Sequence, residues 1–126
     1  MTGARSVAAG LAAEEAVLRH YLESGATLIA RRWRGTRGEI DLILSAGGTY
    51  LFVEVKQAPD HARAMAHLTP PQIGRILATA LAFLATRPEG QAAEMRFDLA
   101  TVDAAGRVRI LEAAFTADDA PAGRSP

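Results

Sequence analysis

The 126-residue sequence contains no cysteine and has no excess charge of either sign. The missing cysteine excludes a disulfide scaffold, a thiol nucleophile and every metal site with cysteine ligands. The 14 Lys and Arg residues balance 14 Asp and Glu, so any contact with a polyanion must be local. No stretch approaches the roughly 20 apolar residues that cross a membrane, and the N-terminal small-residue stretch is a poor signal peptide. We therefore expect a cytoplasmic protein without membrane contact.

Lysine is also scarce, because 13 of the 14 basic residues are Arg and the remaining one is Lys56. An ordinary surface cation in this chain would be Arg, so Lys56 is a candidate for a role that needs a compact ammonium with a shiftable pKa. The length and the 49% hydrophobic content predict a single domain over 1–115. The polar residues 116–126 are predicted to be a disordered tail.

Hydrophobic periodicity and turn residues predict an alternation of helices and strands. In chain order we expect a helix over 6–23, strands over 27–34, 39–45 and 50–56, a loop over 57–68, a helix over 69–86, and strands over 95–102 and 108–115. This order predicts an α/β or α+β fold in which helices flank one mixed sheet. The three histidines have no metal-ligand spacing and are interpreted as surface or loop residues.

The second and third strands form a hairpin whose turn is at Gly47 and Gly48. The residue numbers of every opposed pair then sum to 95, and a slip by one residue would mix the two faces. One face is wholly apolar and consists of the pairs Ile40–Val55, Leu42–Val53 and Leu44–Leu51. The other face carries Ile43–Phe52, Asp41–Glu54 and Glu39–Lys56.

This register predicts that Asp41 and Glu54 lie side by side, with Cβ atoms about 4.5–5.5 Å apart. Adjacent carboxylates need a divalent cation, a shared proton or a basic neighbour, and Lys56 could partly serve. With the backbone carbonyl of Val55 they would make an oxygen site for Mg²⁺ or Mn²⁺. The alternative is a solvated polar face with a Glu39–Lys56 ion pair, and the pattern alone leaves both open.

These residues carry a family resemblance. The sequence resembles the YraN family of the PD-(D/E)xK restriction-endonuclease-like superfamily in two segments, Gly38-Glu39-Ile40-Asp41-Leu42-Ile43 and Phe52-Val53-Glu54-Val55-Lys56. Twelve residues separate Asp41 from Glu54. Similar segments extend over roughly residues 10–115. The resemblance implies a restriction-endonuclease-like mixed sheet of about five strands, similar to archaeal Holliday-junction resolvases. It also implies metal ligands at Asp41 and Glu54, a catalytic Lys56, and, by analogy with resolvases, a homodimer.

Two further positions match the family, each with a simpler interpretation. Glu14 would be another acidic residue of the site and a possible metal ligand, or a solvent-facing helix residue beside Glu15. Gln72 would face the site from the start of the second long helix. Alternatively, Gln72 would belong to a capping box and reach back to the backbone N–H of Thr69.

One stretch combines basic residues with an aromatic side chain. Contacts with phosphates and base stacking are expected from Arg31, Arg32, Trp33, Arg34 and Arg37, and from Arg75 near the start of the second long helix. The alternative is an exposed strand edge blunted by charge.

The sequence thus predicts a Mg²⁺- or Mn²⁺-dependent nuclease or nuclease-like protein acting on DNA, including branched or single-stranded DNA. The alternative is a non-catalytic nucleic-acid-binding or recombination-accessory module that keeps the fold. Ala58, where family members commonly carry a basic residue, favours that alternative, whereas the intact Asp41, Glu54 and Lys56 favour the enzyme.

Overall fold

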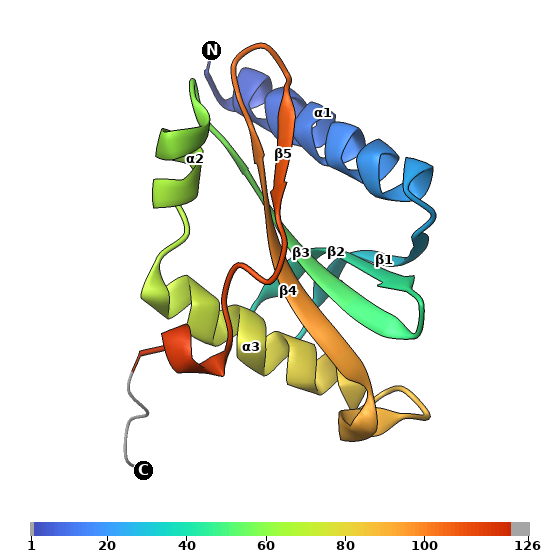
Figure 1. The fold of residues 1–126 in the computed structure, drawn as a ribbon. Coiled ribbons are helices and arrows are strands. Elements are labelled where there is room, and N and C mark those ends of the chain that lie inside the picture. Colours follow the sequence, from blue (N-terminus) through green and yellow to red (C-terminus); the bar gives the residue numbers. More distant parts are fainter. Residues whose placement is uncertain (1, 122–126) are drawn as a thin grey trace.

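A computed structural model describes residues 2–121 and shows an α/β fold built on one five-stranded mixed sheet. The strands lie side by side in chain order (Figure 1): β1 (Thr27–Arg34), β2 (Glu39–Ala46), β3 (Thr49–Gln57), β4 (Glu94–Val102) and β5 (Val108–Leu111). All neighbours are antiparallel except β3 and β4, which are parallel. A parallel pair needs a crossover connection, and the helical segment between β3 and β4 supplies it. The predicted mixed sheet flanked by helices is confirmed.

Two long helices cover the two faces of the sheet (Figure 1). Helix α1 (Thr2–Glu23) buries one apolar stripe against the first face, and α3 (Pro70–Leu84) buries another against the second. The α1 stripe consists of Ala13, Val17, Leu18 and Tyr21; the α3 stripe includes Ile73, Ile76, Ala80, Phe83 and Leu84. This spacing places each set on one side of its helix. None of the helices described here is long and apolar enough to cross a membrane.

The hairpin register is confirmed where the two strands pair. The observed β2–β3 pairs run from Leu42 with Val53 to Ala46 with Thr49, and the residue numbers of each pair sum to 95. The glycines of the turn, Gly47 and Gly48, both have positive φ angles, as a two-residue hairpin turn favours.

Three expectations about the elements need correction, and one element was not expected. The predicted loop over 57–68 contains a short helix, α2 (His61–Ala66), whose N-cap Asp60 accepts a hydrogen bond from the backbone of Arg63. Helix α1 begins at Thr2, earlier than predicted. Strand β5 ends at Leu111 rather than at residue 115. A 3₁₀ turn, η1 (Gly90–Ala92), precedes β4.

Residues 116–121 of the predicted tail contain a short helical turn. A second 3₁₀ turn, η2 (Ala117–Asp119), is stabilised by a capping box between Thr116 and Asp119. Ala120 packs against the cluster under α3. The turn is therefore held by its own capping hydrogen bonds and by apolar contact with α3. The rest of the predicted tail, 122–126, lies outside the described residues.

Candidate functional site

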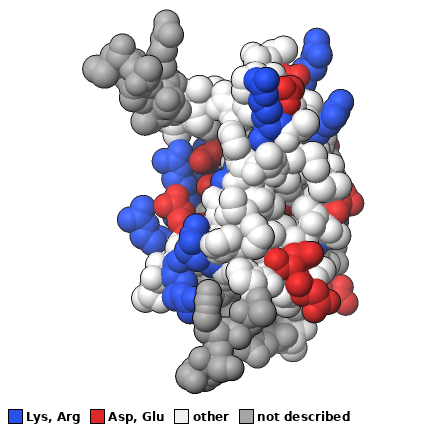
Figure 2. Space-filling view, turned by 90° about the vertical axis from the view of Figure 1, so that its left-hand side faces the viewer, with Lys and Arg blue, Asp and Glu red and all other residues white. Residues whose placement is uncertain are grey.

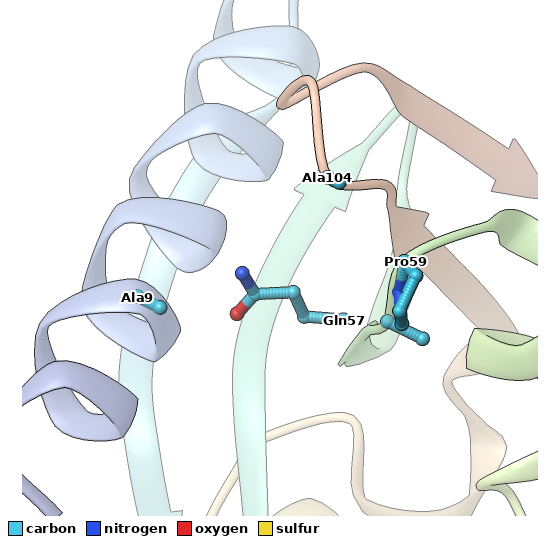
Figure 3. Close-up of a pocket in the computed structure, with 5 residues that line it drawn as sticks. Ala9, Gln57, Pro59 and Ala104 are labelled. Carbon is cyan, nitrogen blue, oxygen red and sulfur yellow. The ribbon is translucent and has the colours of Figure 1, made fainter. Parts of the chain in front are cut away.

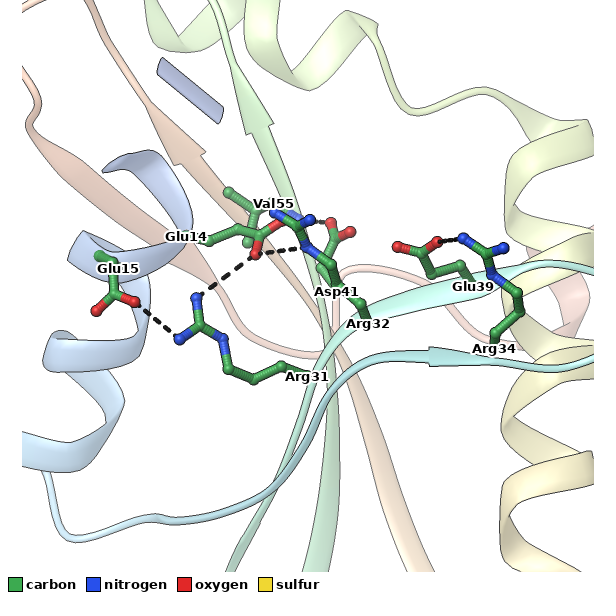
Figure 4. Close-up of polar contacts among 8 residues, drawn as sticks. All are labelled: Glu14, Glu15, Arg31, Arg32, Arg34, Glu39, Asp41 and Val55. Carbon is green, nitrogen blue, oxygen red and sulfur yellow. Dashed lines mark hydrogen bonds and ion pairs between the residues drawn. The ribbon is translucent and has the colours of Figure 1, made fainter. Parts of the chain in front are cut away.

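The site begins where β2 and β3 separate. Their ladder ends at the Leu42–Val53 pair, so Asp41 and Glu54 do not form the next ladder pair as predicted. Instead, Oδ2 of Asp41 accepts a hydrogen bond of 2.8 Å from the backbone N–H of Val55 (Figure 4). The carboxylate of Asp41 thus takes the place that a strand carbonyl would fill, and its position is fixed by the backbone of β3.

The same separation interrupts the alternation of side chains along β2. Leu42 lies in the core under α1, whereas Ile40 lies with Ile43 in the core under α3. The prediction that Ile40 shares a face with Leu42 and Val55 is therefore wrong. The reason is local: the ladder with β3 stops at Leu42, and the period of two on which the register argument depends holds only where the ladder is unbroken.

Glu54 is buried beside Asp41 with little compensation. Its residue is 7% exposed, and Oε1 accepts no hydrogen bond from any residue that the structure describes. Its other oxygen, Oε2, lies 4.0 Å from Nζ of Lys56. Buried polar atoms are nearly always hydrogen-bonded, so Oε1 is the one oxygen of this carboxylate that lacks a partner among the described residues.

Both carboxyl groups titrate abnormally. Burial raises the pKa of Glu54 above its ordinary value, and the negative charge of Asp41 raises it further. The charge of Lys56 and a hydrogen bond from the backbone of Asp41 oppose the rise. Burial also raises the pKa of Asp41, against the hydrogen bond from Val55, and the charge of Glu14 adds to the increase. The pair therefore favours a bound proton or a cation at neutral pH.

The chemistry of the donors fits a hard divalent cation. Two carboxylates with an unpartnered oxygen are the ligand type that Mg²⁺ and Mn²⁺ prefer. Among residues 9–90 and 92–121, no three His, Asp or Glu side chains lie close enough together to hold a metal ion. Asp41 and Glu54 would therefore bind the ion with water, and the backbone carbonyl of Val55 stays a predicted ligand.

Glu14 projects from α1 toward this site, and its residue is only 9% exposed. The prediction of a solvent-facing side chain is therefore wrong. Two arginines of β1 hold it: Nε of Arg32 lies 3.3 Å and Nη2 of Arg31 lies 3.7 Å from Oε1 (Figure 4). Arg31 also contacts the exposed Glu15 at 2.8 Å.

Glu39 does not contact Lys56 as the register predicted. Its Oε1 lies 3.1 Å from Nη2 of Arg34, and the Arg34 side chain is 79% exposed (Figure 4). The separation of the strands at Asp41 explains the change, because the pairing that would oppose Glu39 to Lys56 does not continue past Leu42.

Gln72 does not form the capping box. The Thr69 side chain makes no capping hydrogen bond, and Oε1 of Gln72 is buried without a partner among the described residues. The alternative, a side chain held near the site, stays a prediction.

The sequence also shows which family the fold represents. It matches the family described as "Uncharacterised protein family UPF0102", which is the YraN family, over residues 13–102. The chain belongs to this family. A UPF0102 protein of Cereibacter sphaeroides is 52% identical over 93% of this chain and 100% of its own length. UPF0102 proteins of Ruegeria pomeroyi (52% identical, 90% of this chain and 92% of the relative) and Dinoroseobacter shibae (46%, 86% and 81%) are also similar.

Asp41, Glu54 and Lys56 all fall within the part matched by UPF0102, as does Glu14. The structure brings Asp41, Glu54 and Lys56 together from the two strands of one hairpin, and Glu14 approaches from α1. Their catalytic and metal-binding roles stay predictions.

The basic residues of this UPF0102 chain are less available than the sequence indicated. Arg31, Arg32 and Arg34 are each paired with a glutamate. Arg37 and Arg75 are exposed. Figure 2 shows one face on which basic and acidic side chains are interspersed rather than gathered into one basic field.

Trp33 packs edge-on against Phe83 of α3, with ring centroids 5.4 Å apart. It is also among the side chains that pack on the core under α3. This packing explains an aromatic residue at this position, and base stacking by Trp33 stays a prediction.

Two polar clusters of this UPF0102 chain were missed from the sequence. His61 is not an ordinary loop residue: its Nδ1 lies 2.7 Å from Oγ1 of Thr101, and its Nε2 lies 3.6 Å from Oδ2 of Asp103. These contacts join α2 to β4 and to the turn that follows it. The second cluster surrounds Asp98, which is completely buried. No residue spacing indicated either cluster, because both join elements that are far apart in the sequence.

A cavity of about 430 Å³ opens at the end of β3, immediately after Lys56 in the sequence. Ala9, Gln57, Ala58, Pro59 and Ala104 line it. The Gln57 side chain extends toward α1 (Figure 3). The small lining residues leave open space next to the strand that carries Glu54 and Lys56.

Proposed function

We propose that this UPF0102 protein is a metal-dependent nuclease that hydrolyses phosphodiester bonds in DNA, including branched or single-stranded DNA. The observation that supports the proposal most strongly is the buried oxygen of Glu54, which has no partner in the described chain although Asp41 lies beside it. A structural carboxylate would be expected to have its hydrogen bonds completed by the fold. A buried carboxylate oxygen without a partner, beside a second carboxylate, is typical of a site that binds a cation.

Asp41 and Glu54 would hold Mg²⁺ or Mn²⁺. The bound ion would polarise a phosphate oxygen and lower the pKa of a bound water. Asp41 is fixed for this task by the backbone N–H of Val55 at 2.8 Å, so one carboxylate oxygen is oriented before any ligand arrives.

Lys56 would orient the attacking water or stabilise the negative charge that develops on the phosphate. Its side chain is 16% exposed, and its Nζ lies 4.0 Å from Glu54. That distance is long for a hydrogen bond, so the ammonium keeps donors for a substrate or a water. Its nearness to Glu54 also confines the ammonium to the site.

A cleavage assay tests the proposal. Labelled single-stranded, duplex and forked DNA would be incubated with Mg²⁺ or Mn²⁺ and the wild-type protein, with EDTA as the blank. We expect metal-dependent cleavage of at least one DNA, a loss of about 100-fold or more in Lys56→Gln, and little recovery in Lys56→Arg, because a broad guanidinium does not replace a compact ammonium.

Glu39→Gln is the control, since it removes a carboxylate of β2, the strand of Asp41, that is paired with an exposed arginine. It should cleave like the wild type. Cleavage that survives in Lys56→Gln, or that is the same in EDTA, would contradict the proposal. DNA binding without cleavage on every substrate would favour the non-catalytic module instead.

A further inference from the structure

Glu14 stands between the acidic site and two arginines. Its carboxylate lies 3.3 Å from Arg32 and 3.7 Å from Arg31, and its negative charge acts on Asp41. The same carboxylate is therefore within electrostatic reach of the proposed metal ligands and in direct contact with two of the residues expected to bind phosphates.

The backbone of β1 is distorted at this contact. Arg32 has a φ of 49°, in the left-handed region that is unfavourable for residues other than glycine. It lies between the ladder pairs Arg31–Leu42 and Trp33–Ile40, and thus opposite Asp41. Both Arg31 and Arg32 thereby reach α1, whereas Trp33 packs under α3. Strained residues of this kind concentrate at functional sites.

Glu14 is also kept apart from the two proposed metal ligands. No three acidic or histidine side chains of the described chain come close enough together to enclose an ion. Glu14 is thus near Asp41 without completing a metal site, and the arginines are its immediate partners.

We propose that Glu14 couples the metal to nucleic acid: without metal it occupies Arg31 and Arg32, and a divalent cation at Asp41 and Glu54 attracts its carboxylate and releases both arginines for phosphates. The proposal rests on the proposed function. A guanidinium binds a phosphate as well as it binds a carboxylate, so the released arginines exchange one anion for another. Because coupling is reciprocal, nucleic acid must also tighten metal binding.

Fluorescence anisotropy with a labelled forked DNA tests this coupling, in EDTA and in Ca²⁺. Calcium takes the same kind of oxygen ligands as Mg²⁺. The experiment measures DNA binding and does not depend on cleavage. In EDTA we expect Glu14→Gln to bind DNA roughly fivefold more tightly than the wild type, or better. Ca²⁺ should then strengthen binding less in Glu14→Gln than in the wild type.

The control variant is Glu23→Gln, which makes the same charge change at an exposed position of the same helix. It should leave DNA affinity within about twofold of the wild type, as expected for a distant surface charge screened by salt. Thermal unfolding would confirm that every variant is folded.

A second pair of variants assigns the effect to the arginines. Introducing Glu14→Gln into Arg31→Gln, and into Arg31→Gln with Arg32→Gln, should give a progressively smaller gain in affinity. Arg31→Gln alone keeps the test valid if the double arginine variant does not fold, because the strand is regular at Arg31.

An equal gain in DNA affinity in the protein that lacks both Arg31 and Arg32 would overturn the coupling, since it would show only the effect of removing a negative charge. Unchanged DNA affinity in Glu14→Gln would overturn it as well. In either case saturable Ca²⁺ binding by the wild type would leave the proposed metal site standing. Absence of Ca²⁺ binding would instead contradict both proposals.

Discussion

Two buried carboxylates on neighbouring strands, Asp98 of β4 and Glu54 of β3, are treated by the fold in opposite ways. Asp98 is fully buried and accepts hydrogen bonds from the Tyr21 hydroxyl (2.7 Å), two nitrogens of Arg96 (both 2.8 Å) and the backbone of Ala113 (3.1 Å). Glu54 is nearly as buried, has an oxygen without a partner among the described residues, and lies 4.0 Å from its nearest cation.

The difference separates a structural carboxylate from a ligand-binding one. At Asp98 the chain supplies both the counter-charge and the hydrogen bonds, and it even adopts a left-handed backbone at Ala113 to do so. At Glu54 the chain supplies burial, a lysine at 4.0 Å and the backbone of Asp41, but no partner for Oε1 among the described residues. A buried carboxylate whose hydrogen bonds are all made stabilises the fold. A buried carboxylate that lacks a hydrogen bond and lies beside a like charge favours the binding of a cation.

The largest expected effect is the loss of the structural carboxylate. Asp98→Ala leaves Arg96, the Tyr21 hydroxyl and the Ala113 N–H without their acceptor, and should lower the free energy of unfolding by about 3 to 5 kcal/mol. Urea denaturation followed by circular dichroism measures this. A loss below about 1 kcal/mol would mean that the network is not a source of stability.

Removing one hydroxyl from the same network should have a smaller effect. Tyr21→Phe keeps the aromatic ring in the core under α1 and deletes only the hydrogen bond to Asp98, which should cost about 1.5 kcal/mol. Urea denaturation of the two variants side by side checks the order. An equal loss in the free energy of unfolding for Tyr21→Phe and Asp98→Ala would contradict the view that Asp98 is the centre of this network.

Glu54→Gln should stabilise the metal-free protein at pH 8. Folding raises the pKa of Glu54 from 4.5 to about 8, so between these pH values the native state binds more protons than the unfolded state. The stability of the wild type therefore falls as the pH rises from 4.5 to about 8. The variant lacks this loss. The two proteins should have equal stability near pH 4 and diverge as the pH increases in EDTA.

Adding Mg²⁺ should reverse the order, since a cation bound at Asp41 and Glu54 stabilises only the wild type. Thermal unfolding at several pH values, with and without Mg²⁺, gives both results. A wild type that is more stable than Glu54→Gln in EDTA at pH 8 would show that Glu54 is a structural residue after all.

The smallest effect is expected at the exposed pair. Glu39→Gln should change the free energy of unfolding by less than about 0.5 kcal/mol, because Glu39 contacts an arginine that is mostly in solvent. A larger change would mean that Glu39 belongs to the site, and that burial does not distinguish the functional carboxylates of this protein from the surface ones.

The sequence predicted the sheet and the elements of the site through local rules. Alternating apolar residues around Gly47 and Gly48 determined the hairpin register, which the pairs from Leu42 to Ala46 confirm. The rules failed where a side chain replaces a backbone group, as at Asp41, because a period of two presumes an unbroken ladder. They also could not predict a left-handed backbone at Arg32, since arginine has no preference for it.

Short or long-range features were equally hard to predict. Helix α2 buries only Ala64, so it has no hydrophobic period, although Asp60 as an N-cap was a readable signal. The partners of Glu14 and His61 come from segments that are distant in the sequence, and no residue spacing within the sequence predicts such contacts.

The most direct test of the central claim is a calorimetric titration of Mn²⁺ into the wild type and Asp41→Asn, with Glu39→Gln as the control. Repeating it between about pH 6 and about pH 8, in buffers of different ionisation enthalpy, reveals the protons released by the raised pKa values of Asp41 and Glu54. The account predicts saturable binding in the wild type and the control, tighter at higher pH, with proton release, and its loss in Asp41→Asn. Equal binding in the wild type and Asp41→Asn, or none in either, would contradict it.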